Sequence, residues 1–276
     1  MESETIGRYA NILLDYWFKR AFGTESRKRL LLLFLRELIP ERDIADISYA
    51  PQEHVNPWPG QKDVRVDVEC IGADGARFIV ELQAARQAAF YERAVFYSSF
   101  AVQEQILRGQ NSYDFPTVYF IGLMDFSMHP GSGEVLYRYS IREETSGERM
   151  TDRLQYIFLE LPNCPSGLEP DPDAGVLENF CWALHNLARL KSKPAGLDAE
   201  IFRLLFESAE IATFTPEERI QYEFDMRTER DFINQIDYAR SEARREALLK
   251  TARQMQEQGI PAELIEQITG LKPQVL

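Results

Sequence analysis

The stretch that most constrains the fold of this chain is VRVDVECIGADGARFIVELQ, residues 64 to 83. Alternating apolar residues on both sides of an Asp-Gly turn predict two short antiparallel strands. Strand side chains alternate between the two faces of a sheet, so each strand has one apolar face and one face with polar groups. The apolar faces are Val64, Val66, Val68 and Cys70 in the first strand and Phe78, Val80 and Leu82 in the second. The opposite faces carry Arg65, Asp67 and Glu69, and then Arg77, Ile79, Glu81 and Gln83.

The register of this hairpin follows from the need to bury both apolar faces in one core. A two-residue turn would pair Val68 with Glu81 and mix the faces. A three-residue loop over residues 73–75 keeps the faces apart, and it puts Gly75 at the position where φ must be positive. This register places Asp67 directly opposite Glu81, with their Cβ atoms roughly 5 Å apart.

Two opposed carboxylates repel each other, so Asp67 and Glu81 need compensation. A divalent cation held between them at about 2.1 Å from each oxygen, the geometry of Mg²⁺, is one solution. The other is solvent exposure or neutralisation by Arg65 and Arg77, since most charged strand faces are simply solvated. An apolar helix after the hairpin predicts that both faces of the sheet are covered, and buried acids are usually paired or bound to metal. Both interpretations remain open at this level.

The order of the expected elements predicts an α/β fold with a mixed sheet flanked by helices. Four prolines and two glycines in residues 162–175 indicate a linker. We therefore expect a domain over 1–165 and an all-helical C-terminal region over 166–276. Helices are predicted over 8–22, 25–39, 88–108, 176–190, 198–212, 215–258 and 262–270. Further strands are predicted near 47–49 and over 115–124, 135–141 and 154–161.

Several blocks of the sequence are similar to a known family. Asp67, followed on the next strand by Glu81-Leu82-Gln83 and then by a helix, resembles the PD-(D/E)XK nuclease motif in its E-x-Q form. The blocks DYWFKRAFG, LLLLFLREL, FIVELQ and FLELP resemble the PD-(D/E)XK family of transposases, also called recombination-promoting nucleases. The resemblance covers roughly residues 8–165, and the ending GIPAELIEQITGL also looks like that of the family.

The resemblance implies a restriction-endonuclease-like fold and Mg²⁺-dependent cleavage of DNA phosphodiesters, with Mn²⁺ as a substitute metal, linked to recombination or transposition. By position in the motif, Asp67 and Glu81 would hold the metal, and the carbonyl of Leu82 would add a ligand. Gln83 stands where the motif usually has lysine, and an amide can position water but supplies no positive charge. Glu69 is the nearest spare carboxylate for a second metal.

Four further residues are candidates for the site. Asp15 either adds a carboxylate to the metal or forms an i, i+4 ion pair with Lys19 on a helix surface. Lys19, Arg93 and Tyr97 are candidate contacts to DNA phosphate. For Arg93 and Tyr97, which share one face of the expected helix, the alternative is a structural role in packing that helix on the sheet.

The net charge of −13 argues against a general nucleic-acid binder. The acidic residues are dense in 143–173 and 200–231, so a locally positive cleft in the first 110 residues remains compatible with the totals. The competing hypothesis is therefore a weak or inactive nuclease fold that serves as a regulator or protein-interaction module. A nucleotide-binding protein is disfavoured, since no Gly-rich phosphate loop occurs.

The remaining features concern zinc and redox sites, the cellular compartment and the expected partners. The three cysteines and three histidines have no zinc or redox spacing. The start, MESETIGRYA, has no secretory pattern, and the longest apolar run is too short to span a bilayer, so a cytoplasmic protein without a membrane partner is expected. DNA is the expected partner, together with a second copy of the chain bound through the C-terminal helices.

Overall fold

The computed structural model describes residues 7–55, 60, 62–87, 89–106, 112–165, 167 and 169–271. The chain divides into two compact units, Met1–Phe214 and Thr215–Leu276. The candidate site residues all lie in the first unit.

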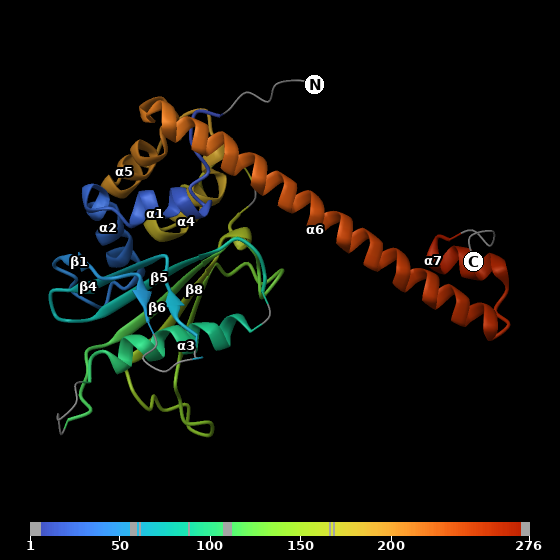
Figure 1. Ribbon diagram of the computed structural model, residues 1–276, viewed down its shortest axis with the longest axis horizontal. Coiled ribbons are helices and arrows are strands. Elements are labelled where there is room, and N and C mark those ends of the chain that lie inside the picture. The colour runs from blue at the N-terminus through green and yellow to red at the C-terminus, as the bar shows by residue number, and fades with distance from the viewer. Residues whose placement is uncertain are drawn as a thin grey trace. The chain divides into compact units, whose positions relative to one another are not determined.

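A mixed six-stranded sheet runs through the first unit (Figure 1). Its strand order is β1-β4-β5-β6-β8-β7, in which β5, β6 and β8 are mutually parallel and the other neighbours are antiparallel. The strands are β1 (Ile47–Tyr49), β4 (Val68–Gly72), β5 (Arg77–Gln83), β6 (Val118–Met124), β7 (Leu136–Ser140) and β8 (Leu154–Glu160). A separate antiparallel pair is formed by β2 (Glu53–His54) and β3 (Val64–Arg65).

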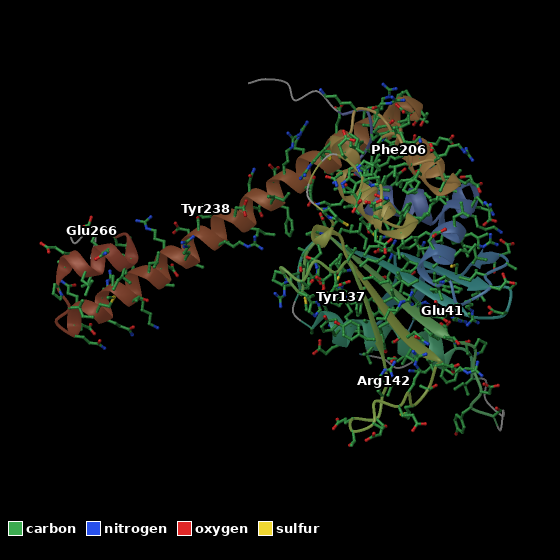
Figure 2. The ribbon with its side chains drawn as sticks, turned by 180° about the vertical axis from the view of Figure 1, so that it is seen from behind. Glu41, Tyr137, Arg142, Phe206, Tyr238 and Glu266 are labelled. Carbon is green, nitrogen blue, oxygen red and sulfur yellow. The ribbon has the colours of Figure 1, made fainter. Side chains whose placement is uncertain are left out.

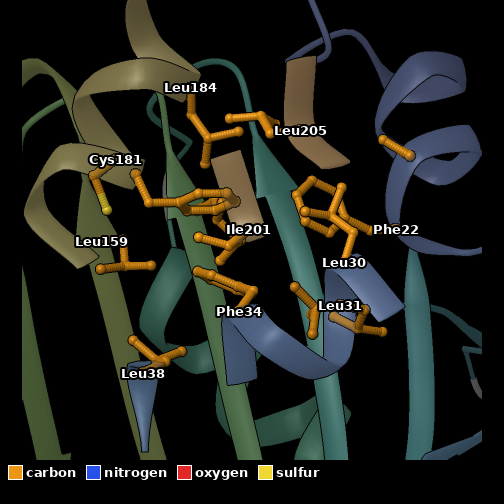
Figure 3. Packing of buried hydrophobic residues seen from close by; sticks show 14 of the residues in the cluster. Phe22, Leu30, Leu31, Phe34, Leu38, Leu159, Cys181, Leu184, Ile201 and Leu205 are labelled. Carbon is orange, nitrogen blue, oxygen red and sulfur yellow. The ribbon is translucent and has the colours of Figure 1, made fainter. Parts of the chain in front are cut away.

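Helices cover both faces of the sheet, which explains the continuous apolar sequence of its inner strands. One face carries α1 (Asp15–Phe22), α2 (Lys28–Leu38), α4 (Val176–Asn186) and α5 (Glu200–Ala209). The other carries α3 (Phe90–Gln103). Figure 3 shows how Phe22, Phe34 and Leu205 from different helices meet over the sheet in the larger core cluster. The mixed sheet with flanking helices confirms the predicted fold class.

The hairpin has the register that its sequence predicts. Val68 pairs with Val80, and Cys70 pairs with Phe78. The amide of Gly72 donates to the carbonyl of Ala76 at 2.8 Å, which closes the three-residue loop. Gly75 has a φ of 84°, the left-handed conformation that glycine adopts at least cost.

The prediction for the first strand was wrong in one respect. Val64 and Val66 pack in the smaller cluster beneath α3, whereas Val68 and Cys70 pack in the larger cluster on the opposite face. Residues 64–70 are not one strand, because the amide of Val66 bonds to the carbonyl of Gln52 and the chain bends before β4 begins. Face alternation holds only within an uninterrupted strand.

Two boundaries also differ from the predictions. The first helix begins at Asp15 rather than residue 8, because Tyr9 forms an isolated β-bridge with Glu210. The two compact units divide at 214/215 rather than 165/166, because α4 and α5 contribute buried residues to the larger core cluster. The predicted end of the helix at 108 lies outside the described residues.

The second unit consists of two helices. The longer one, α6 (Pro216–Glu257), has 42 residues and begins with the predicted capping box, in which Thr215 and Glu218 exchange hydrogen bonds. The shorter one, α7 (Ala262–Thr269), packs on α6 and buries Ile265. Charged residues occur along the whole length of α6, and Figure 2 shows its side chains, with Tyr238 labelled. Among the described helices, none combines the length and the apolar character needed to cross a membrane.

Candidate active site

Asp67 and Glu81 come together at the junction of β4 and β5. Asp67 lies in the bend that precedes β4, and Glu81, Leu82 and Gln83 form the carboxyl end of β5. This end lies next to the carboxyl end of the parallel strand β6, where Gln83 pairs with Met124. Ligands in open α/β sheets commonly bind beyond the carboxyl ends of parallel strands.

Each acid accepts a hydrogen bond from a backbone amide at or next to the other acid. The amide of Asp67 donates to Oε1 of Glu81 at 2.9 Å, and the amide of Leu82 donates to Oδ2 of Asp67 at 2.9 Å. Glu81 is 4% exposed, and the side chain of Asp67 is 15% exposed. The predicted neighbourhood of Asp67 and Glu81 is therefore present, and both side chains are largely removed from solvent.

Burial and mutual repulsion disfavour the charged forms of this pair. Burial raises the pKa of Glu81 to about 8, and the charge of Asp67 adds to the effect. Burial likewise raises the pKa of Asp67, although the hydrogen bond from Leu82 and the charge of Lys19 oppose the shift. The acid pair therefore lies in surroundings that supply too little positive charge for two carboxylates.

Lys19 contacts Asp67 of the pair directly. Its Nζ lies 3.1 Å from Oδ1 of Asp67 and 2.6 Å from Oδ1 of Asp15. Asp15 is 73% exposed and is thus the i, i+4 partner of Lys19, the second of its two predicted roles. Helix α1 can approach the sheet closely because it ends at Gly23, where a Cβ would lie 2.7 Å from the carbonyl oxygen of Lys19 and 3.3 Å from Val68.

The amide of Gln83 is turned toward the neighbouring peptide. Its Nε2 donates to the carbonyl oxygen of Leu82 at 2.8 Å. A carbonyl oxygen has two lone pairs, so this bond leaves one acceptor position on Leu82. Gln83 is 8% exposed, so its position is fixed by packing.

Glu69 does not join the acid pair, although strand alternation suggested it as a spare carboxylate. Its Oε1 accepts from Arg77 at 2.9 Å, and its Oε2 lies 2.6 Å from Nε2 of His54. Glu104 contacts the same two side chains. Its Oε2 lies 2.7 Å from Nη1 of Arg77, and its Oε1 lies 2.6 Å from Nδ1 of His54. Both oxygens of Glu69 are thus committed to a separate buried network, and Arg77 neutralises Glu69 rather than Asp67 or Glu81. Sequence reasoning missed this network, since His54 stands alone in the sequence.

Arg93 and Tyr97 project from α3 toward the same face of the sheet. The guanidinium of Arg93 lies 5.8 Å from the ring centroid of Tyr97, and its Nη1 donates to Oε1 of Gln87 at 2.8 Å. Tyr97 is half-buried and packs against the smaller core cluster. Its pKa is raised by burial first and then by the charge of Glu81, so Tyr97 lies within electrostatic reach of the acid pair.

Gly122 in β6 is a further residue of the site that sequence reasoning missed. It pairs with Glu81, and a Cβ at this position would lie 2.8 Å from Cδ1 of Phe158 and 3.2 Å from Phe90. The signal was a glycine inside an otherwise apolar strand, which marks a close approach.

The described residues contain no group of three or more His, Cys, Asp or Glu side chains that could hold a metal ion. The available donors at this site are the two carboxylates of Asp67 and Glu81 and the carbonyl of Leu82. All three are hard oxygen donors of the kind that Mg²⁺ and Mn²⁺ prefer, so the donor chemistry fits such a cation.

One comparison with known proteins, that with family models, found a match. No curated protein and no solved structure matches the chain. The family model described as "PD-(D/E)XK nuclease family transposase" matches residues 12–239, which include every candidate site residue and most of the chain. The chain therefore belongs to the PD-(D/E)XK nuclease family transposases.

Proposed function

We propose that this protein is a Mg²⁺-dependent endonuclease that cleaves DNA phosphodiester bonds in recombination or transposition. The observation that carries the proposal is the buried acid pair, Asp67 and Glu81, at the carboxyl end of β5. Two buried carboxylates with raised pKa values destabilise the fold when they are charged, and groups perturbed in this way cluster at functional sites. Membership of a nuclease family supports the same conclusion.

Asp67, Glu81 and the carbonyl of Leu82 would hold the metal ion. A bound divalent cation activates water as a nucleophile and stabilises the negative charge that grows on the phosphate. Gln83 can orient a water molecule through its amide but carries no charge. Lys19, which lies 3.1 Å from Asp67, is placed to supply the positive charge that Gln83 lacks.

Plasmid cleavage tests this proposal. The purified protein is expected to nick or linearise plasmid DNA with Mg²⁺ or Mn²⁺, and Asp67→Ala and Glu81→Ala are each expected to abolish cleavage. Glu92→Ala is the matched control, because Glu92 is an exposed carboxylate on α3. Cleavage that persists in both acid-pair variants would refute the assignment of Asp67 and Glu81 as the active site.

A regulatory or protein-interaction role is the second candidate. It is favoured by Gln83, which stands where the motif usually has a lysine. The side-chain amide of Gln83 is neutral and donates a hydrogen bond to the carbonyl of Leu82. Titration calorimetry with Mn²⁺ separates the two functions. Absence of both metal binding and cleavage in a folded protein would favour this second role.

We further propose that the enzyme acts in the cytoplasm and that two copies associate through the second unit. Exposed apolar side chains on α6, among them Ile220 at 70% and Phe224 at 61%, support the association. Sedimentation of wild type and Phe224→Glu tests it, and a monomer at all concentrations would contradict it.

A further inference from the structure

Arg93 has a buried hydrogen-bonding edge that finds no partner in the described part of the chain. Its Nη1 bonds to Gln87, but Nε and Nη2 are both buried and have no hydrogen-bond partner among the described residues. A guanidinium keeps its charge at any physiological pH, so these donors cannot be relieved by deprotonation. Buried donors without partners are rare in native proteins and call for an explanation.

The free edge has the geometry of a two-pronged anion site. Nε–H and Nη2–H project in parallel from one side of the guanidinium, which matches two oxygens of a carboxylate or phosphate. The chain itself uses this edge elsewhere. Nε and Nη2 of Arg29 hold the two carboxylate oxygens of Glu200 at 3.2 and 2.7 Å. Arg93 presents the same fork, and no carboxylate of the residues that the structure describes occupies it.

The surroundings of Arg93 fix this edge in place. The guanidinium lies 5.7 Å from the ring centroid of Phe90 and 5.8 Å from that of Tyr97. Gln87 holds the opposite side of the group through Nη1. The fork is thus oriented before any ligand arrives, which reduces the entropy that binding must overcome.

The acid pair lies near the fork without occupying it. The charge of Arg93 acts on Glu81, yet no ion pair within 4.0 Å joins them among the described residues. A carboxylate and a phosphodiester each carry one negative charge and two oxygens that match the fork, so the acid pair does not discriminate between them. The choice of a phosphodiester rests on the proposed nuclease function.

We propose that the Nε/Nη2 edge of Arg93 is a two-pronged binding site for one backbone phosphate of DNA, beside the acid pair of Asp67 and Glu81. The identity of the ligand rests on the proposed nuclease function. The fork itself rests on the two unpartnered donors.

DNA binding in the presence of EDTA tests the fork without cleavage. The probe is a fluorescently labelled DNA duplex, titrated over a range of salt concentrations. Arg93→Lys keeps the charge and loses the fork, so it is expected to weaken binding by about tenfold with an unchanged salt slope. Arg93→Gln also removes the charge and is expected to reduce the slope of log affinity against log salt by about 1.

Arg86 provides the matched control, since it is an exposed arginine that precedes the same helix. Arg86→Lys is expected to bind the duplex like wild type. Equal affinity of wild type and Arg93→Lys would overturn the two-pronged site, even if the protein cleaves DNA.

Thermal unfolding with inorganic phosphate and EDTA gives a readout that does not depend on nuclease activity. Phosphate is expected to raise the Tm of wild type but not of Arg93→Gln. Without phosphate, Arg93→Gln is expected to unfold at or above the wild-type Tm, since it removes unpartnered buried donors. An equal phosphate response in both proteins would overturn the fork. The protein could also show a phosphate response in wild type alone and yet never cleave DNA. This result would refute the proposed nuclease function but would support the anion site at Arg93.

Discussion

At the scale of single residues, the charge on Glu81 opposes folding. Its pKa is raised from 4.5 to about 8, first by burial and then by the charge of Asp67. The unfolded chain releases this proton at a lower pH than the folded protein does. The contribution of Glu81 to stability is therefore lost as the pH rises from 4.5 toward 8.

Glu81→Gln is expected to stabilise the metal-free protein while it abolishes cleavage. Gln keeps an oxygen that can accept from the amide of Asp67 but carries no charge. At pH 8 the gain in free energy of unfolding should be about 1–3 kcal/mol. Denaturant unfolding with EDTA measures it, and Mn²⁺ should then stabilise wild type but not the variant. A less stable Glu81→Gln at pH 8 would contradict the strained acid pair.

Gly122→Ala tests the packing beside Glu81. A Cβ at this position would lie 2.8 Å from the ring of Phe158, so overpacking should cost about 1–3 kcal/mol of unfolding free energy. The double variant with Phe158→Leu removes part of the obstructing ring and should recover some of the loss. Wild-type stability of Gly122→Ala would show that the ring can move aside.

At the scale of elements, the hairpin shows what could be predicted from sequence and what could not. Its register followed from two local rules. The apolar residues of the two strands must face the same core, and the loop must place Gly75 where φ is positive. Together these rules predict that Asp67 lies beside Glu81. The switch of core face between Val66 and Val68 could not be predicted, because it depends on a hydrogen bond from Val66 to Gln52 in a distant loop. The role of Glu69 was missed for the same reason, since its partner His54 lies on another strand.

The network around Glu69 joins four elements by charge. His54 comes from β2, Glu69 from β4, Arg77 from β5, and Glu104 directly follows α3. The hydrogen bond to Glu69 is the largest of the effects that raise the pKa of His54 to about 9. A histidine with a raised pKa stabilises the fold fully below its unfolded pKa of 6.5 and loses this effect as the pH rises through 9.

The free energy of unfolding is therefore expected to fall between pH 6.5 and 9 by roughly 2–3 kcal/mol through His54. Glu81 changes stability in the same direction at lower pH, so the measurement is best made in the Glu81→Gln background. His54→Gln in that background should lose most of the slope. A slope that is unchanged by His54→Gln would mean that the histidine is neutral in the folded protein.

At the scale of the whole molecule, the proline-rich stretch over 162–175 does not coincide with the observed division between the two compact units, which lies at 214/215. Pro and Gly mark an irregular connection, but they do not show whether the helices beyond it return to the same core. They do return, since Phe180, Trp182 and Phe202 are buried with residues of α1 and α2. The long helix α6 was predictable, because the capping box at Thr215 is a local signal and coincides with the observed division of units.

Truncation distinguishes the two boundaries. A chain of residues 1–214 retains α4 and α5 and is expected to unfold cooperatively, with cleavage activity if one copy suffices for nicking. A chain of residues 1–165 lacks their apolar side chains and exposes the face of the sheet that they cover, so it is expected to aggregate or to lack a cooperative transition. Circular dichroism melts measure both, with Phe202→Asp in the 1–214 chain as a control for the loss of this packing. A cooperative melt of 1–165 would show that α4 and α5 are accessory to the nuclease core, whereas its absence would make them part of the scaffold that positions Asp67 and Glu81.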